Sequence, residues 1–311
     1  MDPKIIFEDG YLLIIEKPSG TVVNRADSVK GETVQDWADK KLGLDMPINK
    51  AVSDKNCAVQ DWAEKKLQIA NCELRIDSKE DIDNLVNTFL SRSGIVHRLD
   101  KETSADYGSL VKTFLSRSGI IHRLDKETSG LLVIAKDPQT FILMQGLFKD
   151  RAVEKRYETL VHGQMQAAAG EINASVGRLP WNREKFGVLP GGKEAQTAWK
   201  LDFLYGTDGG GRFSLLTVFP HTGRTHQIRI HFKYIGHSVV GDSLYAGRKV
   251  YRQDRKFCPR LFLHAKYLKF IHPVTNKVLE AESKLPGDLQ NVLETLSKID
   301  IPKHSEENKG F

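Results

Sequence analysis

The stretch HRLDKETSGLLVIAK, residues 122–136, passes from a highly polar loop directly into an apolar run. Its second half, Leu131–Lys136, predicts a short buried strand, and the loop before that strand can present reactive side chains on a rigid scaffold. Asp137 and Pro138 then supply the N-cap and the first position of a following helix. The stretch therefore predicts a loop–strand–helix unit with Asp125 displayed in the loop.

Segments with strand and helix patterns continue on both sides of this unit. Neither a regular strand–helix–strand period nor a glycine-rich phosphate loop is present. We expect an α+β fold in which helices flank a mixed, mainly antiparallel sheet. The predicted strands are 5–8, 11–16, 131–136, 155–161, 195–204, 212–219, 261–271 and 277–282, and the predicted helices are 36–42, 61–67, 138–149, 225–235 and one after Pro286.

Two segments of the chain are each repeated once, 25 positions further on. Residues 84–108 resemble residues 109–133, and VQDWA at 34–38 recurs at 59–63. A solenoid needs at least three similar units, so partial duplication explains the pattern better. If 34–58 and 84–108 are removed, one continuous, unrepeated sequence remains.

The composition is that of an ordinary globular protein with 311 residues, of which 40% are hydrophobic and 28% charged. No apolar run approaches the ~20 residues that span a bilayer, and acidic residues interrupt the N-terminal apolar segments, so we expect a cytoplasmic protein. Three cysteines without a CxxC pair predict neither a disulfide framework nor a zinc site. The net charge of +6 is compatible with a polyanionic partner.

We expect one domain over residues 1–300, with duplicated segments near 34–83 and 84–133, and a polar tail over 301–311.

Two further clusters carry candidate functional groups. Tyr157 lies in the predicted strand after Lys155 and Arg156, and HTGRTHQIRIH at 221–231 holds three histidines and two arginines. His226 and His231 are five residues apart, whereas helical metal ligands usually lie four apart, and no cysteine or carboxylate is near them. We therefore expect no metal site.

These clusters follow one another in an order that resembles a known family. HRLDKETSGLLVIAK, KRYETLV, HTGRTHQIRIH, GDSLYAG and LFLHAKYLKF resemble, in that order, the motifs of the RluA family of RNA pseudouridine synthases, and FEDGYLLIIEKPSGTVV resembles the N-terminal strand pair of that family. The resemblance covers roughly residues 5–296 apart from the duplicated segments. We expect a catalytic domain with the pseudouridine synthase fold and without an S4 RNA-binding domain.

The resemblance implies a reaction and a set of catalytic residues. The reaction is isomerisation of specific uridines to pseudouridine in structured RNA, either tRNA or rRNA, without a cofactor. Asp125 would be the essential carboxylate, acting as a nucleophile or as a base. Tyr157 would pack on the target base and help to transfer the C5 proton. Arg224 would pair with Asp125 and hold it in one orientation through charge-assisted hydrogen bonds.

The resemblance also implies substrate-binding residues. A stacked uracil must be flipped out of the RNA, and the planar guanidinium of Arg123 is suited to fill the gap or to bind phosphate. Leu263 and His264 match a motif near the base pocket. We expect RNA as the partner, no obligate protein partner and a monomer. The expected substrate-binding residues are His122, Arg123, Thr128, His226, Gln227 and Leu263.

The repeated motif offers a second candidate for the carboxylate, Asp100. Only the copy with Asp125 continues into the strand, and only its spacing to Tyr157 matches the family pattern, so Asp125 is preferred. Two other functions stay open at this point. The duplication could leave an RNA-binding protein of the same fold with impaired catalysis, and Asp125 with Glu127 or Glu154 could serve a glycosidase if the separation of the carboxylates were suitable.

Overall fold

The computed structural model describes residues 2–26, 29–44, 113–180 and 182–300. The second copy of VQDWA, the copy of HRLD that contains Asp100, the predicted helix 61–67 and the polar tail 301–311 lie outside these residues. The expectations placed on those segments therefore remain predictions.

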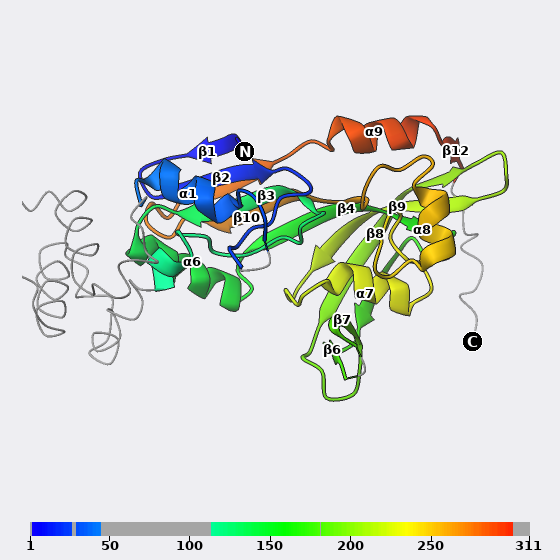
Figure 1. The fold of residues 1–311 in the computed structure, drawn as a ribbon, viewed down its shortest axis with the longest axis horizontal. Coiled ribbons are helices and arrows are strands. Elements are labelled where there is room, and N and C mark those ends of the chain that lie inside the picture. Colours follow the sequence, from blue (N-terminus) through cyan, green and yellow to red (C-terminus); the bar gives the residue numbers. More distant parts are fainter. Residues whose placement is uncertain (1, 27–28, 45–112, 181, 301–311) are drawn as a thin grey trace, which may run out of the picture.

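The described residues form an extended sheet of ten strands, and a separate two-stranded sheet lies beside it (Figure 1). The order along the large sheet is β1-β2-β3-β10-β4-β9-β8-β12, with β11 paired to β10 and β5 paired to β8. All pairs are antiparallel except β3 with β10. The prediction of an α+β fold with a mixed, mainly antiparallel sheet is therefore confirmed. The strands are Lys4–Glu8 (β1), Leu12–Lys17 (β2), Ser129–Ala135 (β3), Glu154–His162 (β4), Ala169–Asn173 (β5), Val176–Leu179 (β6), Asn182–Val188 (β7), Gln196–Gly206 (β8), Arg212–Pro220 (β9), Leu263–Ile271 (β10), Val278–Glu282 (β11) and Ser297–Ile299 (β12).

Two of the helices begin at capping signals in the local sequence. Asp137 caps α6 by accepting a hydrogen bond from the backbone N–H of Thr140, with Pro138 at the first position, as predicted. Thr33 and Asp36 form a capping box at the start of α1, which is built from the first copy of VQDWA. The helices are Val34–Leu42 (α1), Pro138–Lys149 (α6), Gln227–Tyr234 (α7), Arg248–Asp254 (α8) and Gly287–Glu294 (α9).

The sheet is buried on both faces in its C-terminal half. Leu216 and Val218 of β9 pack in one cluster with Ile228 and Phe232 of α7. Side chains that alternate with these along β9, such as Leu215, pack in another cluster with residues of α9. Because successive residues of a strand point to opposite faces, α7 and α9 cover opposite faces of the same strands. This arrangement fixes α7 against the sheet, next to the loop that carries Asp125.

A third cluster supports the N-terminal half of the molecule. It joins β2, β3, α1 and α6, and includes the fully buried Phe114 and Phe141, whose rings meet edge to face. Figure 1 shows this half at one end of the sheet, with β4, β8 and β9 continuing towards the other end. Among the described residues, no helix has the length and apolar character that crossing a bilayer requires.

Candidate active site

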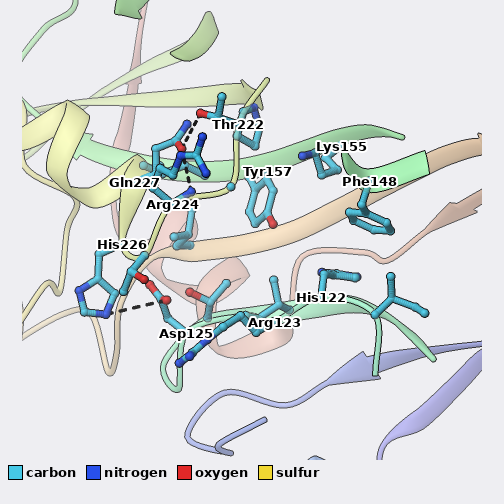
Figure 2. Close-up of a pocket in the computed structure, with 18 of the residues that line it drawn as sticks. His122, Arg123, Asp125, Phe148, Lys155, Tyr157, Thr222, Arg224, His226 and Gln227 are labelled. Atoms are coloured by element: carbon cyan, nitrogen blue, oxygen red, sulfur yellow. Dashed lines mark hydrogen bonds and ion pairs between the residues drawn. The ribbon is translucent and has the colours of Figure 1, made fainter. Parts of the chain in front are cut away.

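A cavity of about 600 Å³ lies where the two halves of the sheet meet. Its walls come from the loop before β3, the end of α6, the start of β4, and the segment from Pro220 into α7. Among the described residues that line it, Asp125 is the single carboxylate, against seven lysines and arginines. Figure 2 shows Asp125 and His226 at one end and Phe148 and Lys155 at the other, with Tyr157 between them.

The loop that carries Asp125 is held in place by a very close approach of two strands. Gly130 has a φ of 116°, and a Cβ at this position would lie 2.2 Å from the carbonyl oxygen of Ala265 in β10. Only glycine lets β3 and β10 pair in parallel at this distance. Next to it, the buried Ser129 hydroxyl hydrogen-bonds to Nδ1 of His264 at 3.0 Å, and Nε2 of His264 lies 3.2 Å from the carbonyl of Ser283. Ser129 and Gly130 thus anchor the end of the loop, and His264 does so from behind the cavity.

The arginine that pairs with Asp125 is Arg229, not Arg224. Nη1 of Arg229 lies 3.4 Å from Oδ2 of Asp125, and both side chains are largely buried, at 3% and 18% exposure. Arg224 lies before α7, and its Nε donates instead to the carbonyl of Glu194 at 2.9 Å. The prediction that Arg224 pairs with Asp125 is therefore wrong. The helix α7 begins only at Gln227, so Arg224 lies before it, and the first turn of the helix brings Arg229 to the carboxylate.

Arg229 is itself held by a second, fully buried carboxylate. Its Nε and Nη2 donate to the two oxygens of Asp242, each at 2.8 Å. Burial opposes the charge of Arg229, but the hydrogen bonds and charge of Asp242, followed by the charge of Asp125, raise its pKa above the ordinary value. Asp242 also accepts from the backbone N–H groups of Leu244 and Tyr245. The result is a row Asp242–Arg229–Asp125 with a fixed bidentate pair at its inner end.

Sequence reasoning missed the role of Asp242, although it singled out the segment GDSLYAG. An aspartate next to a glycine, three residues before a tyrosine, was a usable signal, because both Asp242 and Tyr245 contact the site. The guanidinium of Arg229 lies over the ring of Tyr245, 5.2 Å from its centroid. The Tyr245 hydroxyl is 2.9 Å from Nδ1 of His226.

His226 is the second group near Asp125. Its Nε2 lies 3.8 Å from Oδ1 of Asp125, the contact drawn in Figure 2. The residue precedes α7 with a left-handed backbone, φ 55°. Burial lowers the pKa of His226, while the charge of Asp125 acts in the opposite direction. His226 therefore borders the cavity, and its role in substrate binding stays a prediction.

Gln227 was also predicted to bind substrate, but its side chain is fully used within the protein. Its Oε1 accepts from the Thr222 hydroxyl at 2.7 Å and from the backbone N–H of Arg224 at 2.9 Å. Its Nε2 donates to the carbonyl of Gln196 and to the hydroxyl of Thr197. An amide offers two donors and two acceptor positions, so none is left for a ligand. Gln227 instead positions the loop that leads to His226.

The other predicted residues take different places around the cavity. Tyr157 lies in β4, where it pairs with Ala265 and Val218, and its ring enters the cavity (Figure 2). Burial, followed by the charge of Asp125, raises the pKa of Tyr157, so its hydroxyl stays protonated at neutral pH. Leu263 and Thr128 are buried in the cavity wall, and Arg123 is exposed at its edge without an ion-pair partner among the described residues.

His122 forms part of the opposite end of the cavity. Its Nε2 accepts a hydrogen bond from the backbone N–H of Val133 at 3.1 Å, and its ring stacks on Phe148 with centroids 4.7 Å apart. Burial, together with the nearby charge of Lys155, lowers the pKa of His122 to about 3. The ring is therefore neutral at neutral pH.

A buried lysine behind the loop that carries Asp125 was also missed. Lys17 is 0% exposed, and its Nζ donates to the carbonyls of Pro18, Thr21 and Lys126 at 2.9, 2.9 and 3.1 Å. Burial lowers its pKa to about 7, while the charge of Asp125 opposes this shift. Through Lys126, the N-terminal KPSG segment fixes the residue that follows Asp125. A fully buried lysine cannot be recognised from sequence because Lys is normally exposed.

The described residues contain no group of three or more His, Cys, Asp or Glu side chains that could hold a metal ion. The cavity instead combines one carboxylate fixed by Arg229, a protonated tyrosine and a surplus of cations. Such a site suits acid–base or nucleophilic chemistry on a ligand that carries negative charge.

Comparison with known proteins agrees with this class of site. The family described as RNA pseudouridylate synthase matches residues 112–234. The chain is 41% identical over 205 residues to an uncharacterised RNA pseudouridine synthase of Chloroflexus aurantiacus, covering 66% of this chain and 54% of that protein. It is 38% identical to the ribosomal large subunit pseudouridine synthase D of Buchnera aphidicola from Acyrthosiphon pisum, covering 93% of this chain and 72% of that protein.

The fold agrees as well. The solved structure of human RNA pseudouridylate synthase domain containing 1 matches with a TM-score of 0.59 and 21% identity, covering 96% of this chain and 89% of that one. Given the Buchnera match over most of both sequences, the chain belongs to the RluA family of RNA pseudouridine synthases. It spans little more than half the length of some of the curated relatives that it matches.

Proposed function

We propose that this chain isomerises uridines to pseudouridine in structured RNA. The observation that carries the proposal is the carboxylate of Asp125, held by Arg229 in a cavity that Tyr157 also enters. Relatives named as ribosomal large subunit pseudouridine synthases make ribosomal RNA the first substrate to test, with tRNA as the second. The cytoplasmic location, the monomeric state and the lack of an obligate protein partner remain predictions.

The reaction changes the bond that joins one base to its sugar. The bond between N1 and C1′ breaks, the uracil turns in the cavity, and a bond forms between C5 and C1′. The hydrogen on C5 leaves to solvent and N1 gains one, so no oxidant, reductant or cofactor is needed. Asp125 is the group that acts during cleavage, and Arg229 fixes its position, because a carboxylate with a bidentate-held arginine beside it has little freedom to turn.

Tyr157 and Arg123 have supporting roles in this proposal. The ring of Tyr157 can pack on the uracil, and its protonated hydroxyl lies in the same cavity as Asp125. Arg123 is exposed at the cavity edge, next in sequence to Leu124, which packs in the core. A flipped base leaves a gap in the RNA stack, and a guanidinium can fill it by stacking.

The test is release of tritium from RNA labelled at C5 of uridine. Ribosomal RNA and tRNA transcripts should release tritium with the wild-type protein, because C5 loses its hydrogen when it bonds to C1′. Asp125→Asn should reduce the rate by about four orders of magnitude, as removal of a central catalytic group does, with RNA binding retained.

Asp100→Asn is the matched control, because it makes the same change in the other HRLD copy, and it should keep the wild-type rate. Loss of activity in Asp100→Asn but not in Asp125→Asn would show that Asp100, and not Asp125, is the catalytic carboxylate. RNA binding by the wild-type protein without tritium release from any transcript would overturn the proposal in favour of an RNA-binding protein.

A further inference from the structure

The end of the cavity away from Asp125 has an unusual concentration of positive charge. Arg117, Lys149, Arg151 and Lys155 all line it, and we call these four residues the cation cluster. They come from three places, namely the segment before the catalytic loop, the end of α6 and the start of β4.

None of these four cations has an ion-pair partner among the described residues. The acidic side chains closest to them in sequence do not neutralise them. Glu154 binds Arg156 instead, and the exposed Asp150 forms no ion pair with any described residue. Elsewhere the same chain pairs cations readily, as Arg260 with Asp288 and Lys266 with Glu158 show. Within the part of the chain that the structure describes, the charge of the cluster is thus uncompensated.

Lys155 is the most buried member and lies near an aromatic ring. Its Nζ lies 6.0 Å from the centroid of Phe148, and Phe148 stacks on His122. Figure 2 shows Phe148 between Lys155 and His122 at this end of the cavity. Burial, and then the charge of Arg151, lowers the pKa of Lys155. The Phe148 ring therefore lies beside the ammonium, and no described carboxylate forms an ion pair with it.

The turn at the end of α6 places the next two cations. Arg151 has a left-handed backbone with φ 60°, its N–H bonds to the carbonyl of Phe148, and the N–H of Ala152 bonds to that of Leu147. These bonds form a Schellman motif, in which the residue at the position of Arg151 is usually glycine. The motif already satisfies the last carbonyls of the helix, so the side chains of Lys149 and Arg151 are not needed to cap it.

The size of the cavity shows that one base cannot fill it. Cavities of about 300–1,000 Å³ take drug-sized ligands, which are larger than uracil, and this one measures about 600 Å³. With the uracil between Asp125 and Tyr157, the space towards Lys155 remains for another part of the RNA. Phosphate is the group in RNA that uncompensated lysines and arginines bind.

We propose that the cation cluster is a phosphate subsite that binds the RNA backbone beside the uridine held at Asp125. The inference rests on the proposed function, because it places the uridine at the other end of the same cavity. It assigns to Arg117, Lys149, Arg151 and Lys155 the task of fixing the register of the RNA, while Asp125 and its partners carry out the chemistry.

The test compares two double variants that remove the same charge. Arg151→Asn with Lys155→Met removes half of the cation cluster, and asparagine tolerates the left-handed backbone at position 151. Lys277→Gln with Lys284→Gln removes two exposed lysines that do not line the cavity. Thermal unfolding of both variants shows whether each is folded before binding is measured.

The probe is a labelled stem-loop RNA with a single uridine in its loop, and binding is measured over a range of salt concentrations. We expect the cluster variant to bind about tenfold more weakly than the wild type. The slope of the logarithm of the association constant against log salt should become less steep by about 0.7–0.9, the value for one phosphate contact. The control variant should keep the wild-type slope to within about 0.3. Equal slopes for the two variants would overturn the subsite, because removing two cations from the cavity would then change RNA binding no more than removing two exposed lysines elsewhere.

A second arm uses the same RNA with a neutral methylphosphonate in place of the phosphate on either side of the uridine. At one of the two positions, the neutral substitution should lower the affinity of the wild type about tenfold. The same substitution should leave the affinity of the cluster variant unchanged, because this variant already lacks the contact. Losses that add at both positions would contradict the proposal. These binding measurements do not need turnover. If the cluster variant changes the salt slope but the wild type releases no tritium, the phosphate subsite is supported and the proposed enzyme activity is wrong. If the wild type releases tritium but the cluster variant keeps the wild-type slope, the activity is supported and the phosphate subsite is wrong.

Discussion

At the Asp125 end of the cavity, the principal charged groups have fixed partners, whereas at the Lys155 end the cations form no ion pair with any residue that the structure describes. Arg229 is shared by Asp125 and Asp242, and the amide of Gln227 makes every hydrogen bond available to it. The cation cluster, in contrast, has no ion pair among the described residues. Both ends lie in one cavity and are built from the same few elements.

The difference reflects two physical requirements. Catalysis needs groups whose geometry is set before the substrate arrives, and internal partners provide this. Binding of a flexible, highly charged backbone needs groups that are still free to form contacts, so their partners must come from the ligand. Substitutions should therefore lower activity at the Asp125 end, and lower RNA binding while raising stability at the Lys155 end.

After Asp125 itself, the largest effect at the Asp125 end of the cavity is expected for Asp242→Asn. Asparagine keeps the shape of the side chain but removes its negative charge, so the guanidinium of Arg229 loses the charged fork that aims it at Asp125. We expect kcat to fall about a hundredfold, which corresponds to ~2.7 kcal/mol in the barrier, while the affinity for RNA stays within twofold. Single-turnover tritium release and equilibrium RNA binding separate the two quantities.

A control with the same geometry lies outside the cavity. Asp288 binds Arg260 through both oxygens, at 2.6 and 3.0 Å, so Asp288→Asn removes a bidentate pair without touching the site. Its kcat should equal that of the wild type. If Asp242→Asn lowered only the free energy of unfolding and left kcat unchanged, Asp242 would be a structural residue and not a positioning residue for Arg229.

The sequence predicted most of the scaffold because local signals specify it. The Asp137-Pro138 start of α6, the apolar run of β3 and the strand patterns of β4, β8 and β9 all depend on neighbouring residues. The helix α8 was missed because Arg248–Asp254 is almost entirely polar and has no apolar period. The hairpin of β6 and β7 was missed because its strands are short and interrupted by glycine.

The contacts of the site could be predicted less well because they join distant residues. Asp125 and Arg229 are 104 positions apart. The segment HTGRTHQIRIH at 221–231 contains two arginines, Arg224 and Arg229, and its sequence does not show which of them pairs with the carboxylate. The backbone of His226, which delays the start of α7 to Gln227, decides which arginine reaches the carboxylate. No local pattern encodes that choice. The resemblance to a family located Asp125 and Tyr157, but the partner of Asp125 needed the fold.

An intermediate effect is expected from His122 at the unpaired end, through pH. The folded protein keeps His122 neutral down to a pKa of about 3, whereas in the unfolded chain it takes up a proton near pH 6.5. Below pH 6.5 the unfolded state therefore binds more protons, and stability falls by up to about 1.4 kcal/mol per pH unit as the pH drops towards 3.

The variant His122→Gln keeps an acceptor for the N–H of Val133 but cannot take up a proton. Between pH 7.5 and 5.5 we expect the wild type to lose about 1.4 kcal/mol more than this variant, measured by urea unfolding at the two pH values. Parallel losses in the two proteins would show that His122 does not carry the acid sensitivity.

The smallest effect, with the opposite sign, is expected for Lys155→Met. Folding brings the Lys155 ammonium out of water and near Arg151 without a negative partner, and methionine of similar length keeps the contact with Phe148 while removing that charge. The variant should be more stable by about 1 kcal/mol, or roughly 2 °C in Tm, and should bind RNA more weakly.

The matched control is Lys266→Met, since Lys266 is paired with Glu158 at 3.1 Å. This variant should destabilise the protein, because Glu158 is left without a partner in a largely buried position. Differential scanning calorimetry of the two variants decides the matter: a gain for one and a loss for the other supports the contrast between the two ends, whereas a loss for both would mean that internal contacts already satisfy the cation cluster.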